Sequence, residues 1–185
     1  MYLYKLNSRW FAICYSFFIC SALVACRPNV KENKSQYKYF DLKGFIQADS
    51  ARLNRSNPTI SKTVNHNGDS ESKDVKIANW GHELGLFASS DINKPSWRQS
   101  YSVSAKGDSI TYKALTPDLK TRELSIVKTA GKVVNIHIIN HTKNLLYETT
   151  EALTYLPDSV YTINKFQHVI LLGDNRYIIK GKFKK

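Results

Sequence analysis

Cysteine is scarce in this chain, and its distribution excludes several kinds of chemistry. The sequence has three cysteines, Cys14, Cys20 and Cys26, and all of them lie near the start. Beyond residue 26 there is no thiol that could form a disulfide, bind zinc or act as a nucleophile. We therefore expect the body of the protein to fold without disulfides or zinc-thiolate sites.

The motifs that mark common enzyme classes are also missing. The sequence contains no G-x-S-x-G elbow, no G-x-x-x-x-G-K-[ST] loop and no G-x-G-x-x-G turn, so it lacks the signatures of serine hydrolases and nucleotide-binding proteins. The pair His82-Glu83 is similar to part of a zinc-protease helix, but Leu86 stands where the second histidine belongs. We predict that the protein is not an enzyme and that it has no catalytic residue and no cofactor.

Histidines and carboxylates do not cluster along the sequence either. His137 and His141 flank the end of a predicted strand, and no cysteine or acid lies close to them in the sequence. Because metal sites need three or four converging ligands, we predict no metal site. Glu148 and Glu151 are three residues apart on one predicted strand and should point to opposite faces. A hydrolase would require acids and histidines from distant strands to converge.

The beginning of the chain has the layout of a secretory signal peptide. Lys5 and Arg9 precede an apolar run over residues 10–24, and the residues LVAC at 23–26 end it. A basic start, an apolar region and small residues before a cleavage site are the parts of a signal peptide. A membrane-spanning helix would need about 20 apolar residues, and this run is shorter and diluted by serines. An ordinary secretion signal would show a small-x-small site instead.

Because a cysteine directly follows the small residues, this motif resembles the lipobox of bacterial lipoproteins, and the chain is similar to uncharacterised lipoproteins of the Bacteroides group. The resemblance implies cleavage before Cys26, acylation of Cys26 with lipid such as palmitate, and anchoring in the cell envelope. Arg27 stands where the family's inner-membrane retention signal has Asp, so we expect the outer membrane. The expected organisation is a signal peptide over 1–25, a flexible polar tether over 26–38 and a single domain over 39–185.

The chain is basic, with a formal net charge of +12. Basic proteins bind nucleic acid, anionic lipid or acidic glycans. The expected export argues against nucleic acid, so we predict no nucleic-acid partner. The cations are spread along the sequence apart from one cluster at 180–185, which favours a solvated basic surface or attraction to an anionic membrane.

Two segments have helical periodicity. In residues 39–53, Leu42, Phe45, Ile46 and Leu53 recur at helical spacing. Residues 79–88 form the second predicted helix, with a side-chain cap at its first position. Two glycines weaken this second helix by about 1 kcal/mol each relative to alanine.

The remainder of the chain is predicted to form β-strands. Asn67-Gly68 between β-forming segments 59–65 and 71–77 predicts a hairpin, whose charged second arm suits a sheet edge. Seven further strands are predicted at 98–105, 109–115, 121–129, 132–140, 144–156, 159–172 and 176–183. We predict an α+β fold with two short helices packed on a long antiparallel meander. Long strands favour twist and curling, so we expect a half-barrel-like sheet. That architecture resembles the lipoprotein carriers of bacterial envelopes.

Tyrosines supply the candidate ligand-contacting face. Tyr147 and Tyr155 lie on one face of a predicted strand, and Tyr161 and Tyr177 lie on the strands that follow. Each has an apolar ring and a polar tip, which suits contact with sugars or lipids. The alternative is that these tyrosines cap the rim of the core.

The sequence therefore favours a membrane-anchored envelope lipoprotein with a non-enzymatic binding or structural role. Its expected partners are the membrane, through the N-terminal lipid, and an envelope protein, a glycan or a lipid that binds on the sheet. An inhibitor or accessory subunit that acts through the exposed hairpin 59–77 is one alternative. A carrier of an apolar ligand is another.

Overall fold

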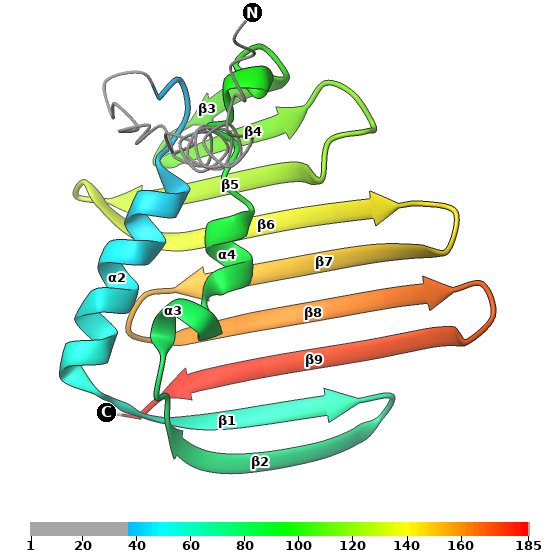
Figure 1. Cartoon of the computed structure of the whole chain (residues 1–185). Helices are drawn as coiled ribbons and strands as arrows, with labels where there is room; N and C mark the ends of the chain where they lie inside the picture. Colours follow the sequence, from blue (N-terminus) through cyan, green and yellow to red (C-terminus); the bar gives the residue numbers. More distant parts are fainter. Residues whose placement is uncertain (1–36, 185) are drawn as a thin grey trace, which may run out of the picture. The chain divides into compact units, whose positions relative to one another are not determined.

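A computed structural model describes residues 37–184 of the chain. The predicted signal peptide, Cys26 and most of the tether lie outside the described residues. The segment Tyr37–Lys185 forms one unit, built on a nine-stranded sheet in which every neighbouring pair is antiparallel. The strand order is β2-β1-β9-β8-β7-β6-β5-β4-β3, and Figure 1 shows that the sheet is open at both edges. The predicted antiparallel sheet is confirmed, and it is not closed into a barrel.

Seven of the strands follow one another as a meander, and their positions match the predicted ones closely. They are β3 (Tyr101–Lys106), β4 (Ser109–Ala114), β5 (Thr121–Thr129), β6 (Lys132–Lys143), β7 (Tyr147–Leu156), β8 (Val160–Val169) and β9 (Gly173–Phe183). The predicted strand 98–105 begins later, because a 3-10 turn, η2 (Pro95–Trp97), precedes it. The two strands predicted over 144–156 and 159–172 are shorter than expected, because residues 144–146 and 170–172 form turns.

The predicted hairpin is confirmed as β1 (Thr59–His66) and β2 (Asp69–Lys76). Asn67 and Gly68 both have positive φ, 53° and 106°, as a two-residue hairpin turn requires. Strand β2 forms one edge of the sheet, as its charge predicts. The hairpin joins the sheet through the last strand, because β1 pairs with β9.

Helix α2 (Leu42–Ser56) corresponds to the first predicted helix. The backbone N–H of Gly44 donates to the side chain of Asp41 at 2.8 Å, which caps the helix. Leu42, Ile46 and Leu53 are buried against the sheet. The apolar positions that predict the helix therefore also dock it.

The second predicted helix is divided in two. Helix α3 (Trp80–Glu83) and helix α4 (Gly85–Ser89) meet at Leu84. Asn79 caps α3, because its side chain accepts a hydrogen bond from the N–H of His82 at 3.0 Å. The break places Trp80 and Phe87 against different strands, and both side chains are fully buried.

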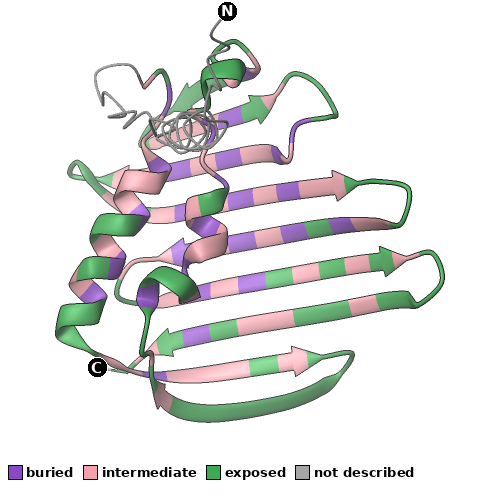
Figure 2. Ribbon diagram, viewed as in Figure 1, coloured by how far each residue is buried: buried purple, intermediate pink, exposed green. Residues whose placement is uncertain are grey.

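All three helices lie on the same face of the sheet and towards one end of its strands (Figure 1). We call this part of the face the helix-covered half. Figure 2 shows that the buried positions concentrate there, whereas the other ends of β8, β9, β1 and β2 are exposed or half-buried. The core contains Leu84, Leu124, Ile136 and Leu153, none of which is accessible to solvent. The fold thus leaves the opposite end of the same face, the helix-free half, without a covering element among the described residues.

Candidate binding surface at the helix-free end of the sheet

A row of polar side chains crosses the sheet where the helix-covered half ends. Successive register pairs place these residues side by side on five neighbouring strands, from β6 to β1. This polar row consists of Asn140, Glu151, Lys165, Tyr177 and His66. It marks the boundary between the apolar core and the helix-free half of the face.

The buried end of the polar row is tied to the end of α4. The side-chain amide of Asn140 donates to Glu151 at 3.1 Å and to the hydroxyl of Ser90 at 2.8 Å. The side-chain oxygen of Asn140 and the hydroxyl of Thr149 are buried and have no hydrogen-bond partner. Unsatisfied buried polar atoms are costly, so the fold bears this cost at the buried end of the row.

The exposed end of the row is aromatic. The rings of His66 and Tyr177 stack with centroids 4.2 Å apart and planes 8° from parallel. Tyr177 is 37% exposed. A flat pair of this kind offers an apolar surface with polar edges to a partner.

Beyond the polar row, two adjacent turns carry a cluster of exposed aliphatic side chains. Leu145 and Leu146 form the β6–β7 turn, and the β8–β9 turn contains Ile170, Leu171 and Leu172. Between 63% and 92% of each side chain is exposed. We call these five residues the apolar turns. Exposed apolar patches are typical of interaction sites, and both turns lie at the end of the sheet farthest from the helices (Figure 1).

Several backbone groups of the apolar turns are hydrogen-bonded. The N–H of Ile170 donates to the carbonyl of Leu146 at 3.1 Å, which links the two turns. The side chain of Asn144 accepts from the N–H groups of Leu146 and Tyr147, at 2.8 and 2.9 Å. The turns therefore form one unit whose apolar side chains are held outward. Sequence reasoning assigned these residues to strands, although consecutive aliphatic residues beside Asn144 or before Gly173 were a signal for exposed turns.

The four candidate tyrosines share the face that carries the helices, but they do not form one surface. Tyr155 and Tyr161 are cross-strand partners and are fully buried in the helix-covered half. Burial raises the pKa of both hydroxyls above the usual value of tyrosine. Tyr147 and Tyr177 lie in the helix-free half, where they are partly exposed. Only these two can contact a ligand on the surface.

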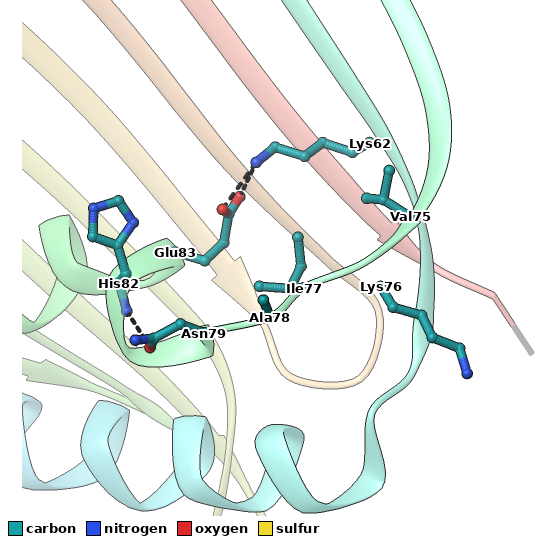
Figure 3. Close-up of a pocket in the computed structure, with 8 residues that line it drawn as sticks. All are labelled: Lys62, Val75, Lys76, Ile77, Ala78, Asn79, His82 and Glu83. Atoms are coloured by element: carbon teal, nitrogen blue, oxygen red, sulfur yellow. Dashed lines mark hydrogen bonds and ion pairs between the residues drawn. The ribbon is translucent and has the colours of Figure 1, made fainter.

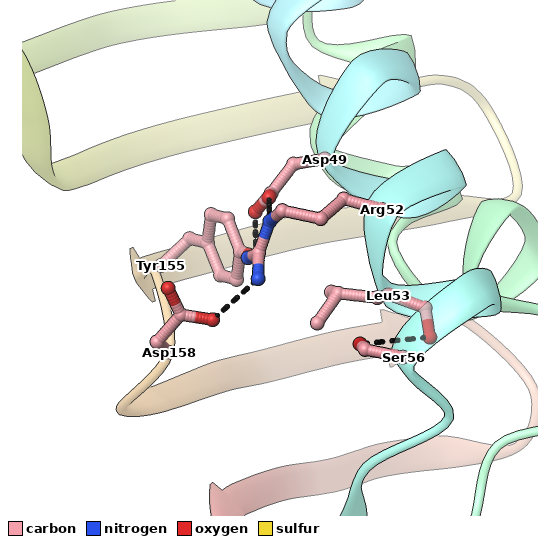
Figure 4. A network of polar contacts seen from close by, with 6 residues as sticks. All are labelled: Asp49, Arg52, Leu53, Ser56, Tyr155 and Asp158. Atoms are coloured by element: carbon pink, nitrogen blue, oxygen red, sulfur yellow. Dashed lines mark hydrogen bonds and ion pairs between the residues drawn. The ribbon is translucent and has the colours of Figure 1, made fainter.

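Tyr155 belongs to a polar network that docks α2 on the sheet (Figure 4). Its hydroxyl donates to Asp49 of α2. Arg52 binds Asp49 at 2.6 Å and also Asp158 of the β7–β8 turn at 2.8 Å. The hydrogen bond that Arg52 donates to Asp49 raises the pKa of Arg52, which is charged in any case. This network also borders a shallow pocket of about 410 Å³.

A second network docks α3 at the other edge of the helix-covered half (Figure 3). Lys62 of β1 binds Glu83 at 2.7 Å, and the hydroxyl of Tyr161 donates to the same carboxylate. The adjoining pocket has a volume of about 480 Å³ and contains His82 and Val75 at its border. Both carboxylates, Asp49 and Glu83, are therefore occupied by partners that fasten helices to the sheet.

The remaining candidate groups do not converge on one site, although His141 lies 3.5 Å from Glu148. Glu148 and Glu151 point to opposite faces of β7, as predicted, because they are three residues apart on one strand. Glu151 is buried on the face that carries the helices, and Glu148 lies on the other face, where it pairs in register with His168. His137 and His141 each lie within hydrogen-bond distance of a threonine on β7. Among residues 37–184, no three histidine, cysteine or acidic side chains are close enough to hold a metal ion.

None of the helices that the structure describes is both long and apolar enough to cross a bilayer. Comparison with known proteins found no matching family model, no similar curated protein and no similar solved structure. The class that the fold defines is an open antiparallel sheet with helices on one half of one face. Its candidate binding surface consists of the polar row and the apolar turns.

Proposed function

We propose that this chain is a non-enzymatic, lipid-anchored protein of the bacterial cell envelope that binds with the helix-free end of its sheet. The observation that carries the proposal is the cluster of five exposed aliphatic side chains in the apolar turns. Complete burial of such a side chain contributes about 1.5–3 kcal/mol. A partner that covers even part of this cluster would therefore gain substantial binding energy.

The anchor part of the proposal rests on the sequence. The residues LVAC at 23–26 have lipobox order, and Arg27 favours the outer membrane. Two or more acyl chains give stable anchoring, whereas one chain holds a protein only marginally. Ten residues separate Cys26 from Tyr37, and the eleven Cα–Cα steps between the two can span about 40 Å when extended. That length would let the body present different surfaces while it remains anchored.

The shape of the sheet is a further part of the proposal. The strands β6 to β9 have ten to twelve residues each, and long strands twist and coil. We infer a half-barrel-like curl that makes the helix-bearing face concave. On such a face the polar row would lie within reach of a glycan or protein held by the apolar turns.

Lipidation is tested by substitution of the cysteine itself. Cells that express the full chain are labelled with a fatty-acid probe, and the parent is compared with Cys26→Ala and with the control Cys20→Ala. We expect label on the parent and on the control, and no label on Cys26→Ala. Label retained by Cys26→Ala would refute the anchor.

The binding end is tested by photo-crosslinking in cells. A photoreactive residue at position 171 is compared with one at position 134, where Val134 is an exposed aliphatic residue at the opposite end of β6. We expect crosslinks to envelope components at 171 and few at 134. Equal crosslinking at both positions would contradict a binding function of this end.

The edge hairpin is a second candidate surface. All residues of β2 except Val75 are exposed, and the strand has a neighbour on one side only. An exposed strand edge can pair with an extended segment of a partner, which would suit an inhibitor or accessory subunit. Crosslinks at Glu71 rather than at 171 would favour this function. Apolar-ligand carriage has less support, because fully buried side chains such as Phe87 and Leu153 fill the space beneath the helices.

A further inference from the structure

We propose that the surface contacted by the apolar turns is the lipid bilayer itself, so that the protein touches its membrane at two places, through the anchor and through these turns. This inference rests on the proposed lipid anchor, and it specifies what the helix-free end binds. It predicts that the aliphatic side chains of both turns leave water when the anchored protein sits on a membrane.

The composition of the turns favours lipid over a protein partner. Their exposed side chains are leucine and isoleucine only, whereas protein interfaces draw most of their energy from Trp, Tyr and Arg, and leucine is under-represented there. Leucine and isoleucine are among the side chains that enter the hydrocarbon region most readily. The run 169–172 and the pair 145–146 contain no charged residue.

The backbone of the turns is also suited to insertion into the bilayer. Unpaired N–H and carbonyl groups are costly in hydrocarbon, so inserted segments must satisfy them internally. The N–H groups of Asn144, Ile170 and Leu172 donate to carbonyls within the two turns and at their bases. Those of Leu146 and Tyr147 donate to the side chain of Asn144. Folding has therefore already paired the N–H groups of Leu146, Ile170 and Leu172 and the carbonyl of Leu146, which lowers the backbone cost of insertion.

Polar and amphipathic groups follow immediately behind the aliphatic tips. Lys143 binds Glu148 at 3.0 Å, and this contact lowers the pKa of the Glu148 carboxyl, so the pair is ionised. His168 contacts Asp174 at 2.5 Å at the base of the other turn. Tyr147 lies at the start of β7, where an aromatic ring with a polar tip suits the headgroup region. This order limits insertion to the five aliphatic side chains.

Spin labelling tests the contact directly. A cysteine is introduced at Leu171 or Leu145 of the full chain, with Val134→Cys as the matched aliphatic control. Each protein is lipidated in cells, labelled, and reconstituted into vesicles of phosphatidylethanolamine and phosphatidylglycerol. The collision of the label with oxygen, which concentrates in the bilayer, is compared with its collision with a water-soluble nickel chelate. The parent without an added cysteine shows whether the native cysteines react.

We expect the ratio of oxygen to chelate accessibility to rise several-fold at 145 and 171 upon reconstitution and to stay constant at 134. If the protein floats with the vesicles while the label at 171 remains open to the chelate, the bilayer contact is overturned and the anchor stands. A label at 171 shielded from both reagents would indicate a protein contact and would also overturn the inference. If the reconstituted protein does not float at all, both the anchor and the contact are refuted.

Discussion

The two halves of the helix-bearing face are built from the same strands but have different roles. In the helix-covered half, Leu153 and Tyr155 of β7 are inaccessible to solvent. Earlier on the chain, in the turn before β7, Leu145 and Leu146 are 90% and 71% exposed. Hydrophobicity is therefore similar at the two ends of the strands, and the difference is whether a helix covers them. Apolar side chains under the helices stabilise the fold, and those in the turns are available to a partner.

Replacement of matched leucines should give the largest contrast between the halves. Leu153→Ala removes a fully buried side chain and should lower the free energy of unfolding by about 2–5 kcal/mol. The measurement is urea unfolding followed by tryptophan fluorescence, and Leu171→Ala is the matched control. Equal losses in the two variants would show that the turns belong to the folding core.

A single glycine allows a tyrosine to pack in the helix-covered half. A Cβ atom at Gly181 would lie 2.1 Å from a ring carbon of Tyr161, which is fully buried on the neighbouring strand. Gly181→Ala should therefore cost about 1–3 kcal/mol through overpacking. The double variant Gly181→Ala/Tyr161→Leu provides space for the added methyl group. If the double variant loses as much free energy of unfolding as the two single variants together, the steric explanation is wrong.

Alkaline pH should weaken the helix-covered half. Burial raises the pKa of Tyr155 and Tyr161 above the unfolded value of about 10. Above that pH the unfolded chain releases protons that the native state keeps, so each group lowers the free energy of unfolding by about 1.4 kcal/mol per pH unit. The stabilisation is complete below pH 10 and declines as pH rises towards the folded-state pKa. Urea unfolding between pH 9 and 11 should show a shallower decline for Tyr161→Phe, and an unchanged slope would contradict this account.

Polar substitution in the turns should have the smallest effect on folding. Leu171→Ser changes a side chain that is 92% exposed, and such surface changes alter stability by no more than about 0.5 kcal/mol. With the photoreactive residue placed at position 145 instead of 171, the same variant should lose crosslinking at the helix-free end. A large loss of stability would mean that the turns are needed for the sheet itself.

Local features of the fold follow from the sequence because they depend on neighbouring residues. Asn67-Gly68 accepts positive φ at both positions, so the hairpin could be predicted. Asn79 caps a helix through its own side chain. The turns at 144–146 and 170–172 were missed, since aliphatic residues there have the composition of strands. Their exposure depends on the strand boundaries, because β7 begins only at Tyr147 and β8 ends at Val169.

The candidate surface was predicted only in part. Alternation along one strand predicted that Tyr147 and Tyr155 share a face, and the strand register places Tyr161 and Tyr177 on that face as well. Alternation carries no information about which part of a face a helix will cover, so Tyr155 and Tyr161 could not be recognised as core residues. The polar row could not be predicted from the sequence either. Its five residues lie on five different strands and become neighbours only when those strands pair in the observed register.

By itself, the sequence determined the strand-rich α+β body, the helix caps, the hairpin turn and the absence of any thiol beyond residue 26. These properties arise from backbone preferences, side-chain alternation and composition, all of which act over a few residues. Tertiary structure decided that β1 pairs with β9, that the helices share one half of one face, and that two aliphatic turns stand exposed together. Those outcomes depend on contacts between residues that are far apart in the sequence, such as Tyr155 and Asp49, which are separated by 106 positions. Only the packing of the whole domain selects among the possible arrangements.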